Sequence, residues 1–186
     1  EDGSATIQDA GSTVETSYSV VHVKTAKGWK IDSVREIVLP EQGQAQLSDL
    51  DWLVGSWTDA GDDATVDFQV NWARSQKFLT MSFRVTAVDS PLLEGTQIIG
   101  VDPASGKIRS WLFDSDGGIG EGTWNREGDR WLAHMRMTLP DGQSASATNI
   151  YTPIDENSYS WSSVSRRVAG AFLPDIPEVV VSRNSQ

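Results

Sequence analysis

The sequence predicts an all-β fold: an up-and-down antiparallel β-barrel of about ten strands, preceded by a β-hairpin remnant. Short segments in which apolar and polar residues alternate follow one another closely from Ala64 to Arg183. Turns rich in Gly, Pro, Asp and Asn separate these segments, and an apolar stretch ending in Gly55-x-Trp57 precedes them. Tight turns join neighbouring antiparallel strands, and a long sheet removes its free edges best by closing. A β-sandwich is the alternative architecture.

Residues 1–39 form a separate region with strand patterns at 5–9, 15–25 and 29–38. Two or three strands do not form a stable domain in water. We therefore expect this hairpin to pack on the barrel, to pair with another chain, or to be the remainder of a larger sheet. Pro40 and Gly43 predict a linker over 40–46, which places the barrel at 47–186.

The barrel region is expected to open with a short helix that Ser48 caps and that ends before Gly55. A turn is expected over 153–157. The strands expected after the helix are 64–72, 77–88, 95–101, 107–113, 119–126, 130–139, 143–152, 158–168 and 178–183.

Composition narrows the function. The net charge is −11 and no basic patch is evident, which argues against nucleic acid and anionic membrane surfaces as partners. No apolar run approaches the ~20 residues of a membrane-spanning helix. The absence of cysteine excludes disulfides and thiolate metal sites. Because the chain starts at Glu1 without methionine, we expect a processed or truncated product of a longer protein.

No complete catalytic constellation is found. The chain has two histidines, and nucleophile-elbow, phosphate-cradling and zinc motifs are missing. We therefore lean away from an enzyme and expect no cofactor and no metal. An enzyme whose active site lies upstream of this sequence stays open as an alternative to the binding and structural hypotheses given below.

The candidate ligand-binding residues lie in the predicted strands. An arginine that points into a small barrel needs an anionic partner, either an acidic side chain or a ligand carboxylate, and Arg136 and Arg166 are the preferred candidates. The barrel tryptophans either line a pocket or fill the interior. The full candidate set is Trp72, Arg84, Trp124, His134, Arg136, Trp161 and Arg166.

Two resemblances add to this reading. The segments Tyr18–Lys24 and Gly28–Glu36 resemble the last two strands of SnoaL-like domains of the nuclear-transport-factor-2 superfamily. Only residues 5–38 are covered. The parts of that fold that hold its pocket are absent, so no active site carries over. The orphaned hairpin would then complete a neighbour's sheet by strand addition.

Residues 47–183 are similar to uncharacterised bacterial lipocalin-like domains that follow a SnoaL-like domain in some exported proteins. The similarity lies in Leu50–Trp57, Trp111–Gly118, Gly120–Trp124 and Trp161–Arg166. It implies an exported protein, periplasmic or extracellular. The first segment also resembles nitrobindin-like haem barrels and fatty-acid-binding proteins. His134 is the only imidazole of the barrel, but the haem ligand of nitrobindin-like proteins lies nearer the C-terminus, so a hydrogen-bonded structural histidine is favoured.

The leading hypothesis is a non-enzymatic, exported binding module for a small apolar or amphipathic ligand. The alternative is a structural protein with a filled barrel, in which residues 1–38 pair with a neighbouring subunit to form a homo-oligomer.

Overall fold

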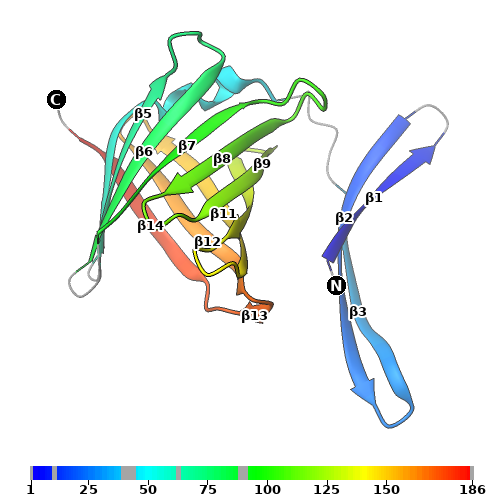
Figure 1. Cartoon of the computed structure of the whole chain (residues 1–186). Coiled ribbons are helices and arrows are strands. Elements are labelled where there is room, and N and C mark those ends of the chain that lie inside the picture. Colours follow the sequence, from blue (N-terminus) through cyan, green and yellow to red (C-terminus); the bar gives the residue numbers. More distant parts are fainter. Residues whose placement is uncertain (1, 10–11, 39–44, 62–63, 88–91, 185–186) are drawn as a thin grey trace. The chain divides into compact units, whose positions relative to one another are not determined.

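The computed structural model describes residues 2–9, 12–38, 45–61, 64–87 and 92–184. The chain divides into two compact units, Glu1–Gly43 and Gln44–Gln186 (Figure 1). Residues 39–44 of the expected linker lie outside the described part of the chain.

The N-terminal unit is a three-stranded antiparallel meander of β1 (Asp2–Asp9), β2 (Ser12–Thr25) and β3 (Gly28–Val38). The turn between β2 and β3 forms where Gly28 has a φ of 111°, a conformation that glycine adopts readily. The Thr25 hydroxyl donates to the Gly28 carbonyl oxygen at 2.8 Å and fixes this turn. The strands expected over 5–9, 15–25 and 29–38 are present and somewhat longer.

The second unit is a closed antiparallel barrel of ten strands, which confirms the predicted fold class. Each strand pairs with its neighbours in the ring, and β11–β12 and β14–β4 contacts complete the closure. β13 (Ala171–Phe172) is a short extension paired with β12 alone. The ring strands are β4 (Gly55–Ala60), β5 (Ala64–Trp72), β6 (Phe78–Ala87), β7 (Leu93–Val101), β8 (Ile108–Asp114), β9 (Ile119–Glu127), β10 (Arg130–Thr138), β11 (Ser144–Asp155), β12 (Ser158–Val168) and β14 (Ile176–Arg183).

Local differences from the expectation have physical causes. The helix η1 (Leu47–Leu53) is a 3₁₀ helix capped by Gln46, not by Ser48. The Gln46 N–H donates to the Asp49 carboxylate at 2.9 Å, and the helix therefore begins at Leu47, before the expected cap Ser48. β4 was missed, because the helical expectation ran up to Gly55. The expected turn over 153–157 is shorter in the structure and covers residues 156–157, since β11 continues through Pro153, which pairs with Tyr159 beside a register irregularity.

The helix η1 lies at one end of the barrel (Figure 1). Large side chains fill this end. Strand alternation directs Trp57, Trp131 and Tyr159 inward, and each is at most 2% exposed. Tyr159 packs edge-to-face on Trp57, with ring centroids 4.9 Å apart. Leu50 and Leu53 of η1 are both fully buried and pack at the same end. We call these five side chains the plug. This end of the barrel is therefore a packed core.

Arg183 locks the plugged end. It lies opposite Trp57 in the β14–β4 pair, and its guanidinium stands 4.0 Å above the Trp57 ring. The guanidinium donates to the carbonyl oxygens of Trp52, Val54 and Glu156 at 3.2, 2.7 and 2.8 Å. Gly55 has a φ of 138°, and a Cβ there would collide with the Arg183 Nη1. The Gly55-x-Trp57 pattern therefore makes room for an arginine from the last strand.

Candidate functional site

The other half of the barrel interior is accessible to solvent. Successive side chains of a strand point to opposite faces, and the inward-facing ones are expected to be buried. Beyond the plug, however, the inward-facing side chains are only partly buried. Phe83, Val85, Leu112, Met137 and Ala147 belong to this set. Most of them are apolar. The interior therefore combines a packed end with a less buried, mostly apolar end, and a barrel of this size is wide enough to hold a small ligand.

Two polar side chains in the interior have no protein partner. Gln97 on β7 is 5% exposed and Ser163 on β12 is 3% exposed. Neither side chain makes a hydrogen bond among the residues the structure describes. Among the described residues, Trp52 Nε1 is the one side-chain polar atom that is inaccessible to solvent and has no hydrogen-bond partner. Because the polar atoms of Gln97 and Ser163 also lack partners but do not belong to this class, they must face space that admits water.

These two groups approach the interior from opposite sides. In the ring order, β7 and β12 are five strands apart in either direction, which places them across the barrel from each other. Gln97 lies between Met81 and Leu112 in its cross-strand row, and Ser163 pairs with Asn149. Buried polar groups normally find hydrogen-bond partners, so an amide and a hydroxyl exposed to a mostly apolar hollow suit a ligand with a polar group.

The electrostatics of the interior favour neutral over negative charge. Asp59 shares the inward face of β4 with Trp57, and desolvation raises the pKa of its carboxyl. Burial also raises the pKa of Tyr151 to about 12, an effect that a hydrogen bond with Trp161 partly offsets. Burial, and secondarily the charges of Tyr151 and Asp59, raises the pKa of Tyr159. The phenols therefore stay uncharged at neutral pH, and Asp59 places a carboxyl group beside this space.

The three candidate tryptophans face inward but differ in surroundings. Trp124 is 2% exposed, and its indole N–H donates to Ser110 Oγ at 3.0 Å, so it belongs to the packed core. The indole N–H of Trp72 donates to Asp51 Oδ1 at 2.9 Å, which ties β5 to η1. Trp161 is partly exposed and lies one inward position from Ser163. Of the three, Trp161 lies nearest to the polar groups of the hollow.

The structure does not bring the candidate arginines together inside the barrel. Arg84 is on the outer face of β6 and forms an ion pair with Glu94 at 2.6 Å. Arg136 is exposed on the outer face of β10. Arg166 donates to the Pro174 carbonyl oxygen at 2.8 Å. The expected inward arginine is therefore not found at Arg84 or Arg136, because both alternate with inward apolar residues.

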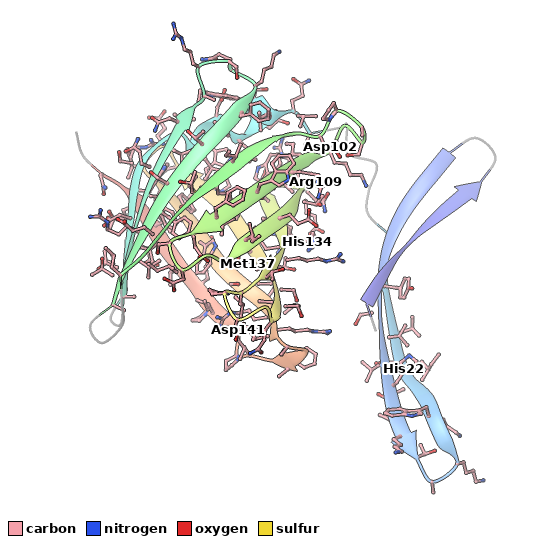
Figure 2. The ribbon with its side chains drawn as sticks, viewed as in Figure 1. His22, Asp102, Arg109, His134, Met137 and Asp141 are labelled. Atoms are coloured by element: carbon pink, nitrogen blue, oxygen red, sulfur yellow. The ribbon has the colours of Figure 1, made fainter. Side chains whose placement is uncertain are left out.

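His134 lies on the outer face of β10, whereas Met137 of the same strand faces inward (both are labelled in Figure 2). Its Nδ1 is 3.1 Å from Thr148 Oγ1, in keeping with a hydrogen-bonded structural histidine. Partial desolvation lowers the pKa of the ring, and the charge of Glu127 opposes this effect. An outward imidazole cannot ligate a group held inside the barrel.

Sequence reasoning missed Gln97, Ser163 and Asp59. The signal was present for Gln97, which interrupts the inward face of a strand otherwise carrying Leu93 and Ile99. A polar residue at a core position of an alternating strand marks either a buried hydrogen bond or a pocket. Ser163 sits among several serines of β12, and alternation places it on the same inward face as Tyr159 and Trp161, a signal that the serine-rich stretch hides.

No protein-family model matches this chain, and no curated protein matches it. Among the described residues, no group of three or more His, Asp or Glu side chains is placed to hold a metal ion. In the same part of the chain, no helix has the length and apolar character needed to cross a membrane.

Proposed function

We propose that this protein is a non-enzymatic binding module that holds a small amphipathic molecule in the accessible half of its barrel. One observation carries the proposal: Gln97 and Ser163 are at least nine-tenths buried, lack protein partners and face the barrel interior among mostly apolar side chains. Both groups face space that admits water and have no protein partner, so each can hydrogen-bond a ligand; in a filled core, a polar group left unpaired would cost about 1–3 kcal/mol.

The chemistry of the pocket favours a ligand with an apolar body and a neutral hydrogen-bonding group. An amide and a hydroxyl can bind an alcohol, amide or carbonyl group. A carboxylate would face the Asp59 carboxyl, and Arg84 and Arg136, which could have balanced it, lie on the outer surface. Long-chain alcohols and amides therefore fit better than fatty acids.

A displacement assay tests this proposal. The uncharged fluorophore N-phenyl-naphthylamine is bound to the full chain and displaced with decanol or with decanoate. Decanol is expected to compete better than decanoate. Ala147→Trp, which fills the inward space, is expected to abolish fluorophore binding, while Thr86→Trp on the outer face of β6 leaves it unchanged.

A second variant covers the case in which Ala147→Trp does not fold. Gln97→Leu keeps the side-chain volume, removes the amide, and is expected to weaken decanol binding about fivefold. The matched control is Thr96→Val, the outward neighbour on the same strand. Equal decanol affinity in Gln97→Leu and the unmodified chain would refute the proposal.

The resemblances extend this proposal. We propose a lipocalin-like barrel, supported by the contact of Arg183 with Gly55 and Trp57 at the plugged end, and a SnoaL-like origin for the β2–β3 hairpin. Export to the periplasm or cell exterior is part of the same proposal and rests on the resemblance alone.

A second function, self-assembly through the N-terminal sheet, is favoured by the exposure of its apolar residues. Trp29, Ile31 and Val34 of β3 are 67%, 60% and 59% exposed, and β3 is an edge strand. Such a sheet is expected to pair with a second copy. Light scattering of Ile31→Lys should then show a smaller oligomer than the unmodified chain, while Phe172→Ser, which removes an exposed aromatic residue of the barrel, leaves the mass unchanged.

A further inference from the structure

The barrel carries a groove of about 650 Å³ whose lining side chains lie mostly on the outer face, and it also touches the inward-facing positions Gly120, Met137 and Ala145. It crosses β8 to β12, and two cross-strand rows of outward side chains surround it. One row runs from Phe113 through Ile119 and Thr138 to Ser144. The other contains Trp111, Glu121, Arg136, Ser146 and Arg167.

The outside of a barrel is normally convex, so this hollow needs a local cause. The β11–β12 pairing shifts register between Ser146 and Thr148. Ser165 and Ala169 have φ values of 54° and 50°, which bend β12 before β13. A bulge of this kind kinks the strand and increases its twist. Arg167 and Gly170 of this bent segment line the groove.

The two ends of the groove differ in chemistry. Phe113 and Ile119 are 50% and 53% exposed and, with Trp111, form an apolar aromatic wall. Arg136 and Arg167 lie toward the other side, near the hydroxyl-bearing Ser146. The groove is therefore amphipathic, with a flat apolar surface beside cationic groups.

The charge balance leaves the groove positive. Arg136 and Arg167 outnumber the one carboxylate of the lining, Glu121, which forms an ion pair with Arg109 at 2.7 Å; Arg109 also lies 3.9 Å from Asp102 (Figure 2 labels Asp102 and Arg109). Arg136, directly opposite Glu121 in the register, makes no hydrogen bond or ion pair within the part of the chain that the structure describes. Arg167 stands 4.3 Å from the Phe172 ring centre. A positive hollow on a chain of net charge −11 favours an anionic occupant.

We propose that this groove binds a small organic anion with a flat apolar body, such as an aromatic carboxylate or sulfonate. Arg136 pairs with the anionic group, Ser146 and Thr138 supply hydroxyl hydrogen bonds, and Trp111 and Phe113 contact the ring system. The ligand class differs from that of the interior hollow, where the polar groups are neutral.

Anilinonaphthalene sulfonate is the probe for this site, because it combines an aromatic body with a single negative charge. Its fluorescence is titrated with the full chain, and Arg136→Gln is expected to weaken binding about tenfold. Arg130→Gln is the matched control, since Arg130 is an exposed arginine of the same strand that pairs with Glu127 at 3.4 Å. An NMR spectrum should show the probe shifting the indole N–H of Trp111 but not that of the buried Trp124.

The outcomes separate the explanations. Unchanged affinity in Arg136→Gln, an equal loss in Arg130→Gln, or an unmoved Trp111 signal would each overturn the groove site. Displacement of the probe by decanol would place it in the interior and would also overturn the proposal. Weaker decanol binding in Gln97→Leu does not change the expected binding of anilinonaphthalene sulfonate, so the two experiments test the two sites independently.

Discussion

Removing the Arg183 side chain should destabilise the barrel more than removing any ordinary surface arginine. In Arg183→Met, three guanidinium hydrogen bonds to main-chain carbonyl oxygens are lost, together with the stacking on Trp57. A hydrogen bond to a charged group contributes roughly 1.5–3 kcal/mol when buried. Arg183 is partly exposed, so solvent replaces part of this energy. We expect the free energy of unfolding to fall by about 3 kcal/mol.

Urea denaturation followed by tryptophan fluorescence measures this change. Arg130→Met is the matched control, because it removes one positive charge from an exposed pair and should cost less than about 1 kcal/mol. Gly55→Ala should be similarly destabilising to Arg183→Met, since its Cβ takes the space of the guanidinium and its φ of 138° disfavours alanine. A loss below about 1 kcal/mol in Arg183→Met would refute the view that this arginine locks the plug.

The other predictions concern the core and the pH dependence of stability. Gly122→Ala should cost about 1–3 kcal/mol in urea denaturation, because the added Cβ meets the Met135 sulfur and lies 3.0 Å from Ser110 Oγ. Because burial raises the pKa of Tyr151 to about 12, its phenol ionises at lower pH in the unfolded chain than in the folded one. The free energy of unfolding should therefore fall between about pH 10 and 12, and Tyr151→Phe should reduce that slope. For His134, whose folded pKa is lowered, stability should be lost as pH falls below about 6.5, and His134→Gln should reduce this loss.

The alternating pattern predicted the architecture because a half-buried strand places residues of one kind on each face. The strands 64–72 and 158–168 were predicted with their observed bounds, Ala64–Trp72 and Ser158–Val168. Where the pattern is short, the prediction failed. β4 begins at Gly55 and has only Trp57 as a large apolar residue, so its six residues did not register as a strand.

The site was less predictable than the fold. Whether an arginine of a strand points inward or outward follows from the alternation of side chains along that strand. Arg84 lies between the inward-facing Phe83 and Val85, so its outward direction could have been predicted. The outer groove depends on the register shift beyond Ser146, which leaves no mark in an apolar–polar pattern. The Arg183 lock joins residues from opposite ends of the barrel sequence, a contact that only closure of the ring creates.

Native mass spectrometry of the full chain with decanol tests the central claim most directly. If the barrel holds one amphipathic molecule inside, the unmodified chain should retain a single decanol, and Ala147→Trp should retain none. A chain that flies at its bare polypeptide mass, or an adduct that survives in folded Ala147→Trp, would contradict an interior binding site.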